Sequence, residues 1–313
     1  MSGLADVDGF VHEDLQQFPL TSFQGAHFQD TVSIDSSELD PEFVVRAGTY
    51  DGGSPTGGAA FSLDGGGNWT LFSTYPVKNN YPIGGTVAVS ATSHLVVWRP
   101  FLDTAYVSKD VGSTWTKSIG APIDNSSCCH RIGIDKAYPL LLAADRVVGN
   151  VFYILDWNGD FFRSEDGGYN WRKVSVIPGL RGGYKYYIKA CRHLQGEIWV
   201  SADWGGLWRS SNGGNSWQQI GQFERSWLVA FGQGRKNNSS IPAVYAFARQ
   251  RIGHRDGIFI SEDMGVTWTP IIDPQRPYLP GTDDPWSMAA DPIKFGRLYL
   301  GTLGRGIYLA TFN

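Results

Sequence analysis

The residues that could do chemistry are concentrated at the start of the chain. Residues 4–15 read LADVDGFVHEDL and place four carboxylates (Asp6, Asp8, Glu13 and Asp14) and one histidine in twelve positions. A carboxylate can serve as a general acid, a general base or a hydrogen-bond acceptor, depending on its burial and its partners. An acidic segment near a terminus is more often simply solvated. The segment is therefore either a solvated leader or half of an active site.

Other catalytic chemistries lack their sequence signatures. The chain has no G-x-S-x-G segment, no P-loop, no dinucleotide fingerprint and no Cys/His spacing typical of zinc. Three cysteines (Cys128, Cys129 and Cys191) are too few for a disulfide framework. Both a bridge from Cys191 to one of the adjacent pair and free thiols remain open. Any reaction is expected to use carboxylates, without a metal or a cofactor.

A second group of candidate residues combines tryptophan with aspartate in short turns. The segments LDWNGD and ADWGGL contain Asp156 with Trp157 and Asp203 with Trp204, and RGGYKYYIKA contributes Tyr184. A tryptophan at a loop tip can stack on the apolar face of a sugar ring, while a neighbouring carboxylate can accept hydrogen bonds from hydroxyl groups. The alternative is that these aromatic side chains pack inside the protein.

An internal repeat supplies the elements that must position these residues. Five segments share the pattern S-x-[DN]-x-G-x-x-W, namely SLDGGGNW, SKDVGSTW, SEDGGYNW, SSNGGNSW and SEDMGVTW. Their tryptophans are spaced by 46, 56, 46 and 51 residues, a period typical of the four-stranded blades of a β-propeller.

Each repeat follows an apolar strand, a turn and a short aromatic strand, and no window has a helical period. The sequence therefore predicts an all-β protein, a single propeller domain spanning residues 1–313. Six units are visible, and the last, RLYLGTLGRGIYLATFN, ends without its motif. We expect an N-terminal strand to complete the final blade, so that seven blades are favoured and six are possible.

The residues of the repeated motif indicate a structural role. Its carboxylate or amide can accept hydrogen bonds from the backbone of a tight turn, glycine permits a positive φ, and tryptophan can pack between blades. These turns are expected to join the third and fourth strands of each blade, which places LDWNGD and ADWGGL at the opposite end. The structural positions are Asp64, Asp110, Asp166, Asn212 and Asp263.

Composition excludes some classes of partner. The chain has 313 residues, a formal net charge of −4 and 42% hydrophobic residues. A protein that binds nucleic acids or anionic membranes needs clusters of Lys and Arg. The sequence contains no such cluster, so neither partner is expected. No apolar run reaches the roughly 20 residues that span a bilayer, and no signal-peptide pattern is visible.

The chain resembles a known family in its opening, middle and closing segments. LADVDGFVHEDL, the hairpins DWNGDFFRSEDGG and GGLWRSSNGG, and the final DPWSMAADPIKFGRLYLGTLGRGIYLATFN together resemble the C-terminal propeller of glycoside hydrolase family 74. That family contains xyloglucanases and oligoxyloglucan reducing-end-specific cellobiohydrolases. The resemblance covers nearly the whole chain from residue 4 onward. It implies an extracellular enzyme in which two seven-bladed propellers face each other across a cleft and cleave with inversion.

The resemblance singles out one of the four acidic residues. The family's C-terminal acid lies in a G-D-[VI]-x-G-F segment, which matches ADVDGF here, with Ala5 in place of the usual glycine. Asp6 would then be the proton donor, and Asp8 would stand at the variable position. An inverting hydrolase also needs a second carboxylate to activate water. In the family that residue belongs to the N-terminal propeller, which this sequence does not contain.

Three functions follow as alternatives. The first is a xyloglucan- or β-1,4-glucan-directed glycoside hydrolase, or the C-terminal half of one that assembles with a missing N-terminal propeller. The second is a non-catalytic propeller that binds glycans. The third is a protein-binding propeller similar to the sortilins, which is less favoured because their cysteine-rich appendix is absent from the sequence.

Overall fold

The computed structural model describes residues 1–3, 8–49, 57–76, 84–123, 141–180, 186–235, 240–271, 285–302 and 306–312. All regular elements in these ranges are β-strands. No helix in the described ranges is long and apolar enough to cross a membrane. The chain divides into two compact units, Met1–Val176 and Ile177–Asn313.

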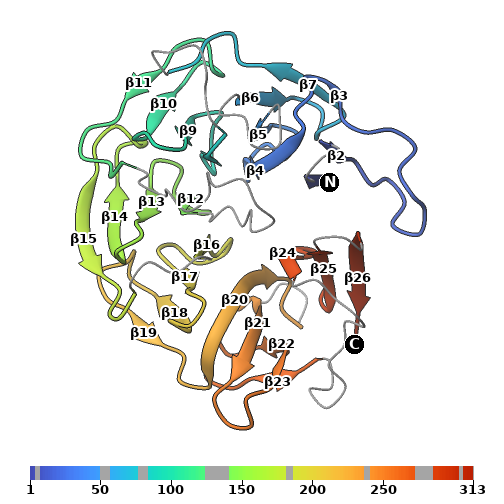
Figure 1. Cartoon of the computed structure of the whole chain (residues 1–313), viewed down its shortest axis with the longest axis vertical. Helices are drawn as coiled ribbons and strands as arrows, with labels where there is room; N and C mark the ends of the chain where they lie inside the picture. The colour runs from blue at the N-terminus through green and yellow to red at the C-terminus, as the bar shows by residue number, and fades with distance from the viewer. Residues whose placement is uncertain are drawn as a thin grey trace. The chain divides into compact units, whose positions relative to one another are not determined.

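The first unit contains three antiparallel sheets that follow one another along the chain (Figure 1). The first sheet comprises β4 (Asp30–Ser36), β5 (Val44–Thr49), β6 (Gly57–Ser62) and β7 (Asn68–Leu71), with β3 (Gln24–Gly25) added in parallel to β7. The second comprises β8 (Thr86–Val89), β9 (Val96–Arg99), β10 (Tyr106–Ser108) and β11 (Thr116–Lys117). The third comprises β12 (Leu142–Ala144), β13 (Phe152–Leu155), β14 (Asp160–Ser164) and β15 (Arg172–Val176). A separate pair joins β1 (Ser2–Gly3) to β2 (Gly9–Phe10).

The second unit repeats this arrangement. Its first sheet comprises β16 (Tyr187–Ala190), β17 (Ile198–Ser201), β18 (Leu207–Ser210) and β19 (Gln218–Gln219). Its second comprises β20 (Phe223–Gly232), β21 (Ala243–Gln250), β22 (Asp256–Ser261) and β23 (Thr269–Pro270). Its third has three strands, β24 (Pro285–Ala290), β25 (Arg297–Thr302) and β26 (Ile307–Thr311).

Apolar side chains fill the space between consecutive sheets within each unit. Motif tryptophans take part in this packing: Trp115 packs against the cluster that joins the first two sheets, and Trp171 belongs to the cluster that joins the second and third. In the second unit Trp268 packs against the cluster that includes Trp199 and Phe223. A motif tryptophan therefore helps to attach its own sheet to the preceding one, because a large ring buries more apolar surface than any other side chain.

The prediction of an all-β protein built from propeller blades is confirmed, but the favoured count of seven blades is not. Six blade-like sheets lie in the described residues, three in each unit. The expected closure of the last blade by an N-terminal strand is also not found there, because β24, β25 and β26 pair only with one another. Instead β3 adds to the first sheet, whose residues bind the N-terminal segment through a buried ion pair.

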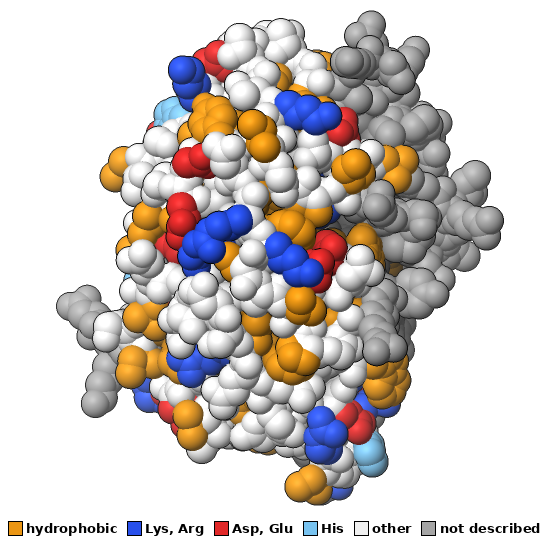
Figure 2. Space-filling view, turned by 90° about the vertical axis from the view of Figure 1, so that its left-hand side faces the viewer, with side chains coloured by type: hydrophobic (Ala, Val, Ile, Leu, Met, Phe, Trp, Pro, Cys, Tyr) orange, Lys and Arg blue, Asp and Glu red, His pale blue; other side chains and the backbone are white. Residues whose placement is uncertain are grey.

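The surface has mixed charge where it is displayed. On the face shown in Figure 2, Lys and Arg side chains alternate with Asp and Glu, and the coloured residues form no broad patch of either sign. This distribution agrees with the absence of basic runs from the sequence.

Candidate functional site

The acidic N-terminal segment begins in a short antiparallel pair. Ser2 pairs with Phe10 and Gly3 with Gly9, so the intervening residues connect two adjacent strands. Asp6 lies in that connection, at residues 4–7, which are outside the described residues. Glu13 and Asp14 are exposed to solvent.

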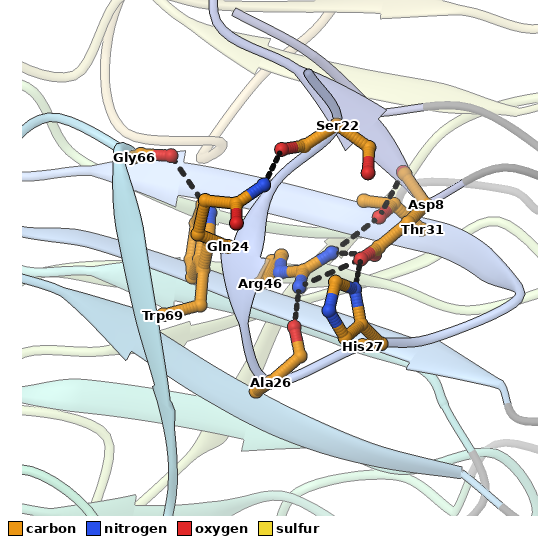
Figure 3. Close-up of polar contacts among 9 residues, drawn as sticks. All are labelled: Asp8, Ser22, Gln24, Ala26, His27, Thr31, Arg46, Gly66 and Trp69. Carbon is orange, nitrogen blue, oxygen red and sulfur yellow. Dashed lines mark hydrogen bonds and ion pairs between the residues drawn. The ribbon is translucent and has the colours of Figure 1, made fainter.

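Asp8 follows immediately and is held on several sides (Figure 3). It is 5% exposed, and its backbone adopts φ 67°, a left-handed conformation in which Asp is tolerated better than most residues. Its backbone N–H donates to the Gln29 carbonyl at 3.1 Å, and its carbonyl accepts from the Thr31 hydroxyl at 2.7 Å. Its carboxylate bonds to Arg46 Nη1 and Nη2, and also contacts Nδ1 of the exposed His27 at 3.1 Å. Asp8 is therefore a structural residue, not a side chain presented to a ligand.

Arg46 lies at the centre of this cluster. It is 0% exposed on β5, and it also donates to the Thr31 hydroxyl at 3.2 Å and to the Ala26 carbonyl. Its guanidinium carbon lies 4.7 Å from the ring centroid of Phe23, 4.8 Å from that of Phe28 and 4.5 Å from that of Trp69. Aromatic faces attract a desolvated cation, and a buried charge must be paired.

The N-terminal segment therefore packs against Trp69 in the way that a preceding sheet packs against the motif tryptophan of the next sheet. Phe23 and Phe28 pack with Trp69, Val44 and Ala60 in one buried cluster. The effect is to fix the chain at Asp8, two positions from Asp6 in the sequence. In the sequence, Arg46 stands out as a single charge within the apolar run FVVRAGTY. The spacing of residues could not identify Asp8 as the partner of Arg46.

His12 in the same segment is also partnered. Its Nε2 lies 2.9 Å from the Ser2 hydroxyl. Burial and, secondarily, the N-terminal ammonium group lower the pKa of His12. Both effects favour the uncharged imidazole.

The five repeated motifs form turns between the third and fourth strands of their sheets, held by their own side chains. In the first, the Ser62 hydroxyl donates to Asp64 Oδ1 at 2.7 Å and accepts the Gly66 N–H at 2.8 Å, while Asp64 Oδ1 accepts the Asn68 N–H at 2.9 Å. Hydrogen bonds from the Asn68 backbone and side chain lower the pKa of Asp64 to about 2. The corresponding acceptors are Asp110, Asp166, Asn212 and Asp263.

At the β13–β14 turn, the aspartate is occupied by its own backbone. Asp156 Oδ1 accepts the N–H groups of Asn158 at 2.9 Å and Asp160 at 2.8 Å. Trp157 is half-buried. Asp156 therefore shapes the tip that carries Trp157.

The equivalent tip between β17 and β18 is more open. Trp204 is 62% exposed, whereas Asp203 is 7% exposed and forms an ion pair with Arg225. Arg225 and its neighbours Trp227 and Arg249 had no recognisable signal in the sequence, because they lie on the next sheet.

The other candidate residues are Tyr184 and the three cysteines. The described residues do not include Tyr184, Cys128 or Cys129. Substrate binding by Tyr184 therefore stays a prediction, and a disulfide between Cys191 and one of the other cysteines stays open. Cys191 is buried. In the described part of the chain, no group of three or more His, Cys, Asp or Glu side chains is placed to hold a metal ion.

Comparisons with known proteins cover almost the entire chain. A xyloglucanase of Paenibacillus sp. is 32% identical over 99% of this chain, which corresponds to 28% of the relative. An oligoxyloglucan-reducing end-specific xyloglucanase of Emericella nidulans is 27% identical over 99% of this chain and 39% of its own length. No protein-family model matches the chain.

Solved structures give the same relationship. The glycoside hydrolase family 74 xyloglucanase of Xanthomonas campestris aligns with 99% of this chain and 41% of its own, at 27% identity and a TM-score of 0.80. The family 74 enzyme of Niastella koreensis aligns with 99% of this chain and 40% of its own, at 25% identity and a TM-score of 0.77. The chain thus spans well under half the length of each of these four relatives.

Proposed function

We propose that this chain, which is related along 99% of its length to part of the glycoside hydrolase family 74 xyloglucanases, is the acid-bearing part of a xyloglucan-directed glycoside hydrolase. The observation that carries the proposal is that sequence and fold similarity to xyloglucanases extend over both units of the chain. In this proposal the six sheets belong to one propeller domain, residues 1–313. Its substrate is the cell-wall polysaccharide xyloglucan, encountered outside the cell.

Asp6 is the proposed proton donor, because it occupies the acid position of the family motif in ADVDGF. Cleavage of a glycosidic bond requires protonation of the departing oxygen while the sugar carbon gains positive character. In an inverting enzyme a second carboxylate activates water, at roughly 6.5–9.5 Å from the acid. We assign that base to the part of the relatives that this chain does not span.

The Asp8–Arg46 ion pair is the proposed positioning element for Asp6. It ties the segment to β5 through contacts that are buried on both sides. Placement matters because a displacement of about 1 Å can cost a hundredfold in rate. Asp8 and Arg46 would therefore act through Asp6, without touching the substrate.

Xyloglucan hydrolysis by the chain, alone and mixed with the N-terminal propeller of a family 74 xyloglucanase, tests the proposal. We expect reducing sugar to be released in the mixture, and Asp6→Asn to remove nearly all of it. Asp14→Asn is the matched control, since Asp14 is an exposed carboxylate of the same segment and should have no effect. Absence of hydrolysis in every mixture, or equal hydrolysis by Asp6→Asn, contradicts the proposal.

A non-catalytic glycan-binding propeller is the second candidate. The observation in its favour is the exposed ring of Trp204 at a loop tip. Binding of xyloglucan that is unchanged in Asp6→Asn, with no hydrolysis under any condition, would favour this candidate.

A further inference from the structure

The Trp204 side chain is exposed, but hydrogen bonds hold the backbone beside it in place. It follows Asp203, whose backbone has φ 50° and forms a two-way bridge to Ser226 of the next sheet. The Asp203 N–H donates to the Ser226 carbonyl at 2.8 Å, and the Ser226 N–H donates back at 3.0 Å. The tip of the β17–β18 turn is therefore attached to β20, although the Trp204 ring itself faces solvent.

A stack of cations and rings supports the indole. The guanidinium carbon of Arg225 lies 4.5 Å from the ring centroids of both Trp204 and Trp227. Arg249 lies 5.7 Å and 6.0 Å from the same two rings. The buried Trp227 stacks on Phe247 with centroids 4.7 Å apart, and its indole N–H has no acceptor among the described residues. Such a support limits the movement of Trp204 before any ligand arrives.

The charges of this support cancel one another. Arg225 and Arg249 are paired residues on neighbouring strands, an arrangement that is unfavourable for like charges without counterions. Asp203 forms an ion pair with Arg225, and Asp256 forms one with Arg249. The row across the turn and sheet is therefore negative, positive, positive, negative, with no net charge.

We propose that Trp204, supported by Arg225 and Arg249, is a binding platform for an uncharged polysaccharide. A planar ring can stack on the C–H face of a pyranose without any charge on the sugar. Because both guanidinium groups are already paired with carboxylates, neither is available to pair with a uronic acid or phosphate group. The choice of xyloglucan as ligand rests on the proposed function, but the platform needs neither Asp6 nor catalysis.

Affinity electrophoresis of the full chain provides the test. Gels containing xyloglucan should retard the chain, and Trp204→Ala should weaken binding by roughly two- to tenfold, the range of one stacking contact. Trp204→Phe should keep part of the binding. Phe18→Ala is the control, since Phe18 is 95% exposed and is in the other unit. Gels containing polygalacturonate, an anionic chain, should not retard the protein.

Three results would overturn the proposal: equal retardation of Trp204→Ala and the unchanged chain, stronger and salt-sensitive retardation on polygalacturonate, or no retardation at all. Unchanged glycan binding by Trp204→Ala together with lost assembly with the N-terminal propeller would instead make Trp204 a protein contact. The results of this binding test can be distinguished from those of the hydrolysis test. Asp6→Ala should bind as the unchanged chain does, so the platform can stand if hydrolysis fails, and hydrolysis can stand if the platform fails.

Discussion

Single residues of the acidic N-terminal segment differ in their burial and in their partners. The four carboxylates of residues 4–15 look equivalent in sequence, yet Asp8 is buried against Arg46 while Glu13 and Asp14 are exposed. The resemblance selected Asp6, and its role stays a proposal. Asp8 could not be assigned from sequence, because its partner lies 38 positions away.

Removing Arg46 should destabilise the protein strongly. Arg46→Met keeps much of the volume but leaves Asp8 buried without its cation, and the expected loss in unfolding free energy is about 3–5 kcal/mol. Denaturant unfolding measures this loss. Combining Arg46→Met with Asp8→Asn should recover part of it, because the uncompensated charge is removed.

An exposed ion pair provides the control for this change. Arg235 pairs with Glu262 through side chains that are 54% and 39% exposed. Arg235→Met should cost at most about 1 kcal/mol, as expected for a solvated pair. Similar losses for Arg46→Met and Arg235→Met would contradict the structural role of the Asp8–Arg46 pair.

At the scale of elements, the repeated motif was the most informative feature of the sequence. It predicted antiparallel sheets and the position of each turn, because its turn residues and its tryptophan recur at a blade-length period. The N-terminal strands were harder to predict. β1, β2 and β3 each have two residues, too few for an alternating pattern, and the parallel pairing of β3 with β7 depends on tertiary contacts.

The site was less predictable than the sheets for a related reason. Trp204 was expected at a loop tip and is exposed there, but its support comes from Arg225 on the next sheet, 22 positions after Asp203. Asp203 was expected to accept hydrogen bonds from a ligand, yet its carboxylate is buried with that arginine. Pairings between neighbouring sheets have no fixed spacing in the sequence.

The motif turns should lose stability in acid. Hydrogen bonds lower the pKa of Asp64 to about 2 from its ordinary value of 3.8. A lowered pKa in the folded state stabilises the protein above the unfolded pKa, and this contribution disappears as the pH falls from about 4 towards 2. Thermal unfolding at several pH values should show the unchanged chain losing its advantage over Asp64→Asn across that interval. A difference between the two proteins that stays constant from pH 7 to pH 2 would contradict this explanation.

The motif tryptophans should differ in importance from the tip tryptophan. Trp171 is 7% exposed and packs between two sheets, so Trp171→Ala should lower the unfolding free energy by about 3–5 kcal/mol. Trp204→Ala removes the same atoms from an exposed ring and should cost less than about 1 kcal/mol. Chemical denaturation of both variants tests the comparison, and equal losses would show that the motif tryptophan does not attach the sheets.

At the scale of the whole molecule, the chain corresponds to one part of its longer relatives. It spans 28% of the Paenibacillus xyloglucanase and 41% of the solved Xanthomonas enzyme. In the proposed two-carboxylate mechanism, the general acid and the general base lie in different parts of such a protein. Asp6 is accordingly the proposed proton donor, and the residue proposed to activate water lies outside this chain.

The most direct test of proton donation varies the leaving group. The chain, mixed with the N-terminal propeller of a family 74 xyloglucanase, would be assayed on xyloglucan and on a xyloglucan oligosaccharide bearing a dinitrophenyl aglycone, which departs without protonation. We predict that Asp6→Asn lowers the rate on xyloglucan by about 10²–10⁴-fold, the usual contribution of a general acid, but changes the rate on the dinitrophenyl substrate much less. Equal losses on both substrates, or no loss on either, would contradict the assignment of Asp6 as the general acid.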